Sequence, residues 1–375
     1  MILGAMSGGK PAVCSRRLFV ASLAAAGRAV SSAAGVVLPP AAERYTDPAT
    51  EFPVLRLTDP AFSSYLPVNA SHAISRRGNF LLYASDVSGR LEAYRLDTKK
   101  GEARQLTDAS ALDSGGLTML QDERGFLYMD GARLMTQLFT AARPRVVYTI
   151  SEGFERVPGL TASIDSLYAA LVERKGSAHR LRLLNLRTGE ATTLAEADEP
   201  MSAPLPRPKR ASVLYLRAGG AWLANYDGKQ NYRLRLADGS VQQALWSPDG
   251  RTVLYLSVPS EPGRLNSIRE FGPDSNQDRA VADTTQFLRF AANTDASVFV
   301  GSSGSKATPY IFLLVRAVKR ELTLCEYHAS DAAMATPVFS ANSQQIYFTG
   351  EMHGKPAIYR MDVEKFVEET TEPAL

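Results

Sequence analysis

Seven short apolar segments recur along the chain, and each follows a turn made of Gly, Asp, Asn or Ser residues. They cover residues 79–83, 125–128, 166–168, 212–215, 252–255, 297–300 and 345–348. Their starts lie 40 to 48 residues apart, which is the length of a four-stranded β-propeller blade. Near-continuous apolar runs are typical of strands that neighbouring sheets cover on both faces. The pattern predicts an all-β fold, a seven-bladed β-propeller with four-stranded antiparallel blades.

The better-preserved repeats also show the other strands of a blade. In the first repeat, turns at 86–89 and 99–101 precede the strand candidates 91–97 and 103–107. The third repeat shows the same order of strand, turn and strand at 184–194. Each turn reverses the chain as a β-hairpin requires.

The two ends of the repeat array predict how the ring closes. The last repeat supplies strands at 336–339, 345–348 and 357–361 but none for the fourth position, whereas residues 54–58 precede the first repeat. Pairing of 54–58 with the last blade closes the ring and removes an open sheet edge. The alternative is an unpaired lead-in strand, which leaves two open edges. Outside the N-terminal segment, helical periodicity is hard to find except at 363–369.

Composition narrows the classes of partner. The chain is 45% hydrophobic and 22% charged, and after the first forty residues it has no apolar run long enough to span a membrane. The formal charge is +3, but residues 1–42 contain four basic residues and no acid. The remainder is close to neutral, so we expect no general attraction to nucleic acid or to anionic membranes, although a protein partner is compatible with this composition.

The N-terminal segment matches an export signal. Ser15-Arg16-Arg17-Leu18-Phe19 resembles the twin-arginine pattern, 18–27 supplies a weakly apolar core, and 32–34 offers small residues for cleavage. Arg28 interrupts the apolar stretch, and a disordered basic tail is the alternative interpretation. We predict a signal peptide and linker over 1–42, one propeller domain over 43–375, and a periplasmic or secreted location.

Cysteine usage is simple. Cys14 lies inside the predicted signal, which leaves Cys325 as the one cysteine of the predicted domain. A disulfide within that domain is then impossible, and the apolar neighbours of Cys325 predict a small buried side chain.

Most catalytic motifs are absent from the sequence, including the nucleophile elbow, the dinucleotide fingerprint, the P-loop and the HExxH zinc motif. Residues 274–278 begin like a calcium loop, but Arg279 replaces the required Gly and Thr285 stands where the bidentate Glu belongs. We interpret this segment as a surface loop. The four histidines show no spacing typical of metal ligands.

Two local matches point to known families. The segment 245–250 (Leu-Trp-Ser-Pro-Asp-Gly) is similar to the repeat turn of TolB-type propellers, which is common. Residues 337–339, 345–348 and 353–359 resemble the last blade of oligogalacturonate lyases, which are seven-bladed propellers. The resemblance extends from residue 57 to residue 363 and so covers most of the predicted domain.

The resemblance implies a specific chemistry. Oligogalacturonate lyases cut galacturonate oligomers by β-elimination, using a metal, usually manganese, that is held by histidines and a glutamine. The metal neutralises the uronate carboxylate and so acidifies the neighbouring carbon, from which a histidine removes the proton. An arginine helps to hold the substrate. These are properties of the family that the resemblance suggests for this chain.

The sequence departs from the family at the positions of that chemistry. The resemblance places the metal ligands and the base at positions that here carry Arg289, Met334, Thr336, Asp331 and Gln243. Of the family's set only Arg207 keeps its identity, so the resemblance implies a catalytic role for Arg207. Because Arg289 repels a dication and Met334 is a poor ligand for a hard ion, we expect no bound manganese and no other cofactor.

Arg289 is open to two interpretations. A guanidinium at the metal position can pair with a uronate carboxylate, with Arg207 and Gln243 completing a substrate-binding site, or it can fill the channel and bond to backbone carbonyls. The first leads to an exported protein that binds or acts on pectic or other acidic oligosaccharides with weak or absent lyase activity. The alternative function is a non-catalytic TolB-like or WD40-like scaffold for protein interaction. Whether the chain is an enzyme stays open at this point.

Overall fold

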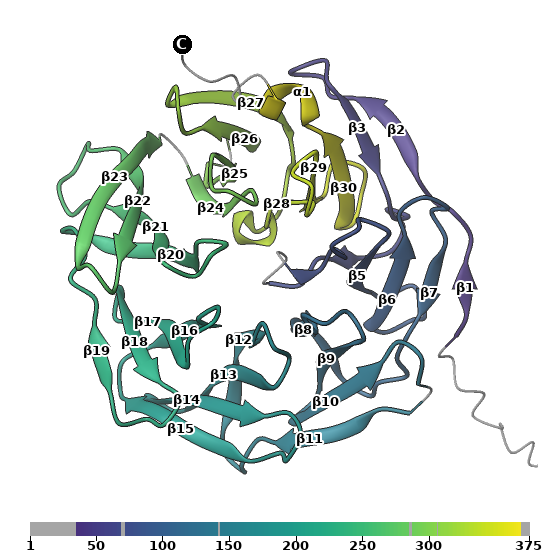
Figure 1. Cartoon of the computed structure of the whole chain (residues 1–375). Helices are drawn as coiled ribbons and strands as arrows, with labels where there is room; N and C mark the ends of the chain where they lie inside the picture. The colour runs from purple at the N-terminus through teal and green to yellow at the C-terminus, as the bar shows by residue number, and fades with distance from the viewer. Residues whose placement is uncertain (1–34, 69–71, 142, 285–286, 306, 369–375) are drawn as a thin grey trace, which may run out of the picture. The chain divides into compact units, whose positions relative to one another are not determined.

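The computed structural model describes residues 35–68, 72–141, 143–284, 287–305 and 307–368. The predicted twin-arginine segment and its cleavage positions lie outside these ranges. The described residues form a ring of seven β-sheets in which neighbouring strands are antiparallel (Figure 1). The predicted seven-bladed β-propeller is therefore confirmed.

The strands follow one another through the blades in chain order. Blade 1 contains β4 (Ser64–Tyr65), β5 (Phe80–Ser85), β6 (Glu92–Asp97) and β7 (Ala103–Gln105). Blade 2 contains β8 (Leu112–Met119), β9 (Gly125–Asp130), β10 (Arg133–Leu138) and β11 (Arg145–Thr149). Blade 3 contains β12 (Glu155–Ala162), β13 (Tyr168–Lys175), β14 (Ala178–Asn185) and β15 (Ala191–Ala197). Blade 4 contains β16 (Met201–Pro206), β17 (Ser212–Arg217), β18 (Gly220–Asn225) and β19 (Asn231–Arg233). Blade 5 contains β20 (Ser240–Trp246), β21 (Val253–Val258), β22 (Asn266–Gly272) and β23 (Gln277–Thr284). Blade 6 consists of β24 (Phe287–Ala292), β25 (Val298–Ser303), β26 (Tyr310–Val315) and β27 (Arg320–Glu326).

The ring closes within blade 7. This sheet contains β28 (Val338–Phe339), β29 (Gln345–Gly350) and β30 (Ala357–Asp362), followed by β3 (Pro53–Arg56) and β2 (Glu43–Thr46) from the other end of the chain. Strand β3 pairs with β30 through Leu55 opposite Arg360 and Arg56 opposite Tyr359. The predicted pairing of 54–58 with the last blade is confirmed.

Two further N-terminal strands extend the sheets. Strand β2 makes blade 7 five-stranded, and β1 (Val37–Leu38) pairs with β7 at the outer edge of blade 1, within the segment predicted as a linker. The turn between β2 and β3 is attached to blade 6, because the buried Asp47 carboxylate accepts a hydrogen bond of 2.9 Å from the Glu326 backbone N–H.

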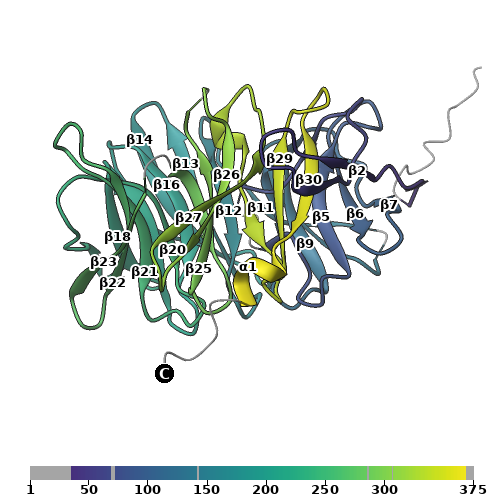
Figure 2. The ribbon, with the colours of Figure 1, turned by 90° about the horizontal axis from the view of Figure 1, so that it is seen from above.

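The first strand of each blade lies nearest the ring centre, and the strands run across the thickness of the ring, which Figure 2 shows from its edge. We call the face where the first strands end the turn face, and the face where they begin the start face. In blades 2 to 7, short turns join the first and second strands on the turn face, whereas residues 66–79 separate β4 from β5 in blade 1.

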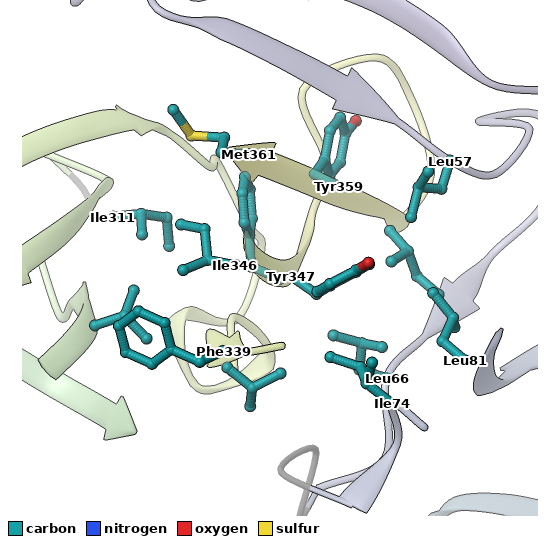
Figure 3. Close-up of a cluster of buried hydrophobic side chains, with 14 of the residues drawn as sticks. Leu57, Leu66, Ile74, Leu81, Ile311, Phe339, Ile346, Tyr347, Tyr359 and Met361 are labelled. Carbon is teal, nitrogen blue, oxygen red and sulfur yellow. The ribbon is translucent and has the colours of Figure 1, made fainter. Parts of the chain in front are cut away.

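The core lies between the blades. The second strands are the apolar runs found in the sequence, and β5, β9 and β25 are buried along their whole length. At the closure, Leu57 lies in a buried cluster with Leu81 and Tyr359 (Figure 3). Cys325 is fully buried as predicted, and burial raises the pKa of its thiol.

One short helix follows the last strand. Helix α1 (Glu364–Glu368) lies within the helical segment that the sequence predicts at 363–369. Among the described residues, no helix is long and apolar enough to cross a membrane.

Candidate functional site

The first strands of blades 5 and 6 place Gln243 and Arg289 at one level of the ring, and the segment before β28 places Thr336 at the same level in blade 7. In each of these blades, a backbone hydrogen bond closes the turn after the first strand. This bond serves as the reference point from which the position of a residue along that strand is counted. These bonds run from Ser247 N–H to Thr252, from Asn293 N–H to Val298 and from Ser340 N–H to Gln345. Each of the three polar residues lies four positions before the donor of its turn. The sequence-predicted positions 243, 289 and 336 are therefore equivalent in three consecutive blades.

The opposite half of the ring carries small residues at this level. The same count in blades 2, 3 and 4 leads to Gly116, Gly159 and Ala203, because Leu120, Ser163 and Arg207 donate the equivalent turn bonds. Among the described positions reached by this count, the polar residues lie on blades 5 to 7, although the Arg156 guanidinium of blade 3 lies beside Gly116. This asymmetry makes that half of the ring the candidate site.

Gln243 is bound to the neighbouring blade. Its side-chain Nε2 donates to the Phe290 carbonyl at 2.9 Å, and its Oε1 accepts from the Phe290 N–H at 2.8 Å. A register shift in β20 directly precedes Gln243, and such bulges redirect side chains. The amide therefore fixes the backbone next to Arg289, and both of its polar atoms are engaged.

Arg289 is half-buried on β24, directly after a register shift in that strand. Burial lowers the pKa of its guanidinium, and the nearby Asp331 carboxylate opposes that shift. Even so, an arginine keeps its charge at neutral pH. Within the described ranges, the guanidinium has no hydrogen-bond acceptor and no carboxylate oxygen within 4 Å. Arg289 is thus a partly desolvated cation with unused donors.

The segment before β28 faces β24. Asp331 begins the short 3₁₀ turn η2 (Ala332–Met334), where its carboxylate accepts from the Ala333 N–H at 2.9 Å. Met334 ends that turn, and Thr336 follows it. The Thr336 hydroxyl oxygen is buried and, among the described atoms, has no hydrogen-bond partner. An unpaired buried hydroxyl is costly in free energy, and a polar ligand atom can satisfy it.

Arg207 lies at the turn face, directly after β16. Its side chain is 5% exposed; Nε donates to the Gly250 carbonyl at 2.9 Å, and Nη1 and Nη2 donate to Asp274 at 3.2 and 2.8 Å. The guanidinium also lies 4.9 Å from the Trp246 ring centre. These contacts join blade 4 to blade 5. They also engage all three guanidinium nitrogens of Arg207, the residue for which the resemblance implies a catalytic role.

The structure does not bring Arg207 and Arg289 together. Arg207 stands four residues further along its strand than the level of Arg289, which corresponds to about 13 Å of strand length. The roles predicted for Arg207, Arg289 and Gln243 stay predictions, but the arrangement separates a turn-face residue from a group deeper in the ring.

The residues at the family's metal positions do not suit a divalent cation. They offer a guanidinium, a thioether, a hydroxyl and one carboxylate, and that carboxylate already caps η2. Divalent manganese is a hard ion that suits several carboxylate, carbonyl or water oxygens. Across the described ranges, no three His, Cys, Asp or Glu side chains are grouped so as to hold a metal ion.

The segment 274–278, which we interpret as a surface loop, covers the turn between β22 and β23 and the first two residues of β23. Asp274 pairs with Arg207, and Asp278 accepts from Arg269 at 3.0 Å. Both carboxylates are therefore used within the fold, as expected for a surface loop.

A separate cavity of about 360 Å³ opens among the turns of the turn face. Its lining includes His72, Arg76 and Asn293, and none of Arg207, Gln243 and Arg289. Burial lowers the pKa of His72 to about 4, and the Arg76 cation acts in the same direction, so this imidazole is neutral at pH 7.

Sequence reasoning missed Arg156 on β12. Its guanidinium donates to the Gly115 and Val157 carbonyls at 3.1 and 2.9 Å and pairs with Asp113, and burial lowers its pKa to about 10. A Cβ on Gly116 would lie 3.3 Å from Arg156 Nε. The glycine pair 115–116 was the signal of this close approach, but the sequence does not name the partner.

The fold and the polar residues Gln243, Arg289 and Thr336 define a β-propeller with a candidate ligand site on the inner side of blades 5 to 7. No family model matches the chain. An oligogalacturonide lyase of Pectobacterium atrosepticum is 23% identical, with 87% of this chain and 97% of the relative covered. A solved oligogalacturonate lyase in complex with manganese has a TM-score of 0.82 and 22% identity, covering 88% of this chain and 98% of that one. The lyase from Vibrio parahaemolyticus has a TM-score of 0.81 and 24% identity over the same shares.

The chain is a distant homologue of oligogalacturonate lyases over nearly its full length, as the residues of the last blade indicated. A TolB propeller from Acinetobacter baumannii is a more remote neighbour, with a TM-score of 0.46 and 12% identity.

Proposed function

We propose that the protein binds acidic oligosaccharides of the galacturonate type on the first strands of blades 5 to 7, with weak or absent β-elimination. The homology supports the class of ligand. The observation that carries the proposal is Arg289, a half-buried cation whose donors have no acceptor among the described residues. A carboxylate pairs with a guanidinium through two parallel hydrogen bonds, which offsets the cost of burying the charge.

The remaining groups at this level support binding more than turnover. Thr336 offers a buried hydroxyl, whereas Gln243 is not a base and is bound to Phe290. Proton removal beside a carboxylate requires strong charge neutralisation in the transition state, which one arginine supplies less well than a metal dication. Binding can therefore persist where the rate of elimination is very low.

The predicted catalytic role of Arg207 requires its release from Asp274. Both terminal nitrogens are bonded to that carboxylate, and the side chain is buried. We therefore assign no substrate contact to Arg207 in the proposed binding mode. The proposal also includes export through the twin-arginine segment, which places the protein where such oligosaccharides occur.

Calorimetry with trigalacturonate tests the binding. We expect Arg289→Ala to weaken binding by about tenfold or more, as the loss of a charge-assisted hydrogen bond predicts. Arg174→Ala is the matched control, because Arg174 is an exposed arginine of blade 3 paired with Glu155. Equal affinity of the wild type and Arg289→Ala would show that Arg289 only fills space.

An activity assay separates binding from turnover. The absorbance of the unsaturated uronate product should stay near the uncatalysed level, and the purified protein should not retain stoichiometric manganese. Rapid turnover with bound manganese would show that the residue correspondence is wrong. Absence of any saccharide binding would leave the scaffold function as the better explanation.

A further inference from the structure

A second cleft, of about 620 Å³, lies on the outer part of blade 4 where the chain passes to blade 5. Its walls include the turn Gly219–Gly220 and the connection 234–239 that follows β19. Both segments lie on the start face, because β20 begins at Ser240, directly after the connection. Arg289 lies near the start of the equivalent strand β24.

Two arginines project from the wall of this cleft. Leu234 is 4% exposed, and its N–H bonds to the Ala221 carbonyl, so the strand direction continues past β19. Because side chains alternate along an extended chain, Arg233 and Arg235 lie on the side opposite Leu234, and both are exposed. Their Cα atoms are about 6.6 Å apart at the usual rise of a strand.

The charges of these arginines are not neutralised by partners in the described part of the chain. Neither guanidinium has a carboxylate oxygen within 4 Å there, whereas the neighbouring Arg217 is paired with Glu199 at 2.7 Å. Asp238 is the acidic residue of the lining. The cleft lining carries two positively charged side chains and one negatively charged side chain, so its net charge is positive.

Gly220 gives the cleft its depth beside Arg233. A Cβ at this position would lie 2.8 Å from Arg233 Nε, so the guanidinium rests against a backbone that only glycine leaves uncovered.

We infer that this cleft is an oxyanion site that holds successive charged groups of a linear polyanion. Two guanidiniums one strand repeat apart each take a carboxylate or phosphate group by paired hydrogen bonds. The choice of an acidic saccharide as the natural occupant rests on the proposed function. The oxyanion chemistry itself does not depend on that choice.

The test is calorimetry at low salt with trigalacturonate and, separately, tripolyphosphate. We expect two binding events for trigalacturonate on the wild type and one on R233Q/R235Q. R174Q/R264Q removes the same charge from exposed arginines outside the cleft lining and should behave as the wild type. Asp238→Asn should strengthen the event that R233Q/R235Q removes, because it deletes the opposing carboxylate.

The outcomes separate this inference from the proposed function. Loss of one event in R233Q/R235Q, with the other lost in Arg289→Ala, supports both. Binding that Arg289→Ala leaves intact and R233Q/R235Q abolishes supports the cleft and contradicts the channel site. Tripolyphosphate binding alone keeps the oxyanion site and assigns it to phosphate. If R233Q/R235Q binds both ligands as the wild type does, the cleft is not an anion site.

Discussion

The side-chain amide of Gln243 binds both backbone groups of Phe290, and the residue before Phe290 is Arg289. The contact joins the first strands of blades 5 and 6 and fixes the strand that carries the half-buried cation. Gln243 thus positions the strand beside Arg289, and its predicted contact with a substrate stays a prediction.

This contact predicts a specific loss of stability. Gln243→Glu keeps the shape of the side chain but replaces the donor with an oxygen that faces the Phe290 carbonyl. We expect the free energy of unfolding to fall by about 1–3 kcal/mol, the cost of an unpaired buried polar group. Denaturant unfolding measures this, with Gln230→Glu as control, since exposed Gln230 only accepts from Asn225 through its side-chain oxygen. Equal effects of the two substitutions would contradict the contact.

Closure of the ring predicts a difference between two shortened chains. A chain that begins at residue 43 loses β1 alone, whereas one that begins at residue 59 loses β2 and β3 and exposes the edge of β30. We expect the first to unfold cooperatively near the wild-type midpoint and the second to lose its cooperative transition. Circular dichroism against temperature measures both. A cooperative second chain would mean that β3 is dispensable.

The pair of Arg207 and Asp274 predicts a pH dependence. The hydrogen bonds from Arg207 lower the pKa of the Asp274 carboxyl. A carboxyl with a depressed folded-state pKa adds stability above its unfolded pKa, about 3.9, and loses it as the pH falls through the folded value. Asp274→Asn should therefore lower the melting temperature at pH 7 and have little effect near pH 2. A difference that stays constant between these pH values would contradict the assignment.

The family correspondence predicts a gain of metal binding. The triple substitution R289H/M334H/T336H places imidazoles at positions that the resemblance assigns to metal ligands, and it removes the repelling cation. We expect manganese affinity to rise by at least tenfold over the wild type, since imidazole is a far better ligand than the groups it replaces. Calorimetry with manganese measures this, with R289A/M334A/T336A as control. No gain over the alanine variant would show that the three positions do not converge.

Export is predicted from two residues. Replacing Arg16 and Arg17 together with Lys should retain the precursor in the cytoplasm, because the twin-arginine pathway requires the pair. Cell fractionation followed by immunoblotting measures the distribution. Unchanged export of this variant would mean that the N-terminal segment is not a twin-arginine signal.

The ring could be predicted because its second strands are buried on both faces and so appear as apolar runs, such as 79–83 in β5. Strand β2 was missed, because Glu43–Thr46 is largely exposed and has no apolar alternation. The site was harder to predict. The resemblance located Gln243 and Arg207, but their partners Phe290 and Asp274 lie 47 and 67 residues further along the chain. Such partners are set by the packing of blades, which local sequence does not encode.

The seam between β3 and β30 also governs where the chain can change length. Ile358 and Thr58, which are joined by a hydrogen bond at this seam, are separated by 300 positions. The entropy of closing so large a loop grows only with the logarithm of its length, so doubling it adds about 0.6 kcal/mol. Insertions in the outer loops of the intervening blades therefore leave the seam almost as easy to close. Evolution and protein engineering can lengthen those loops with little penalty, whereas a shift of register by one residue in β3 would turn the buried Val54 to the other face of the sheet.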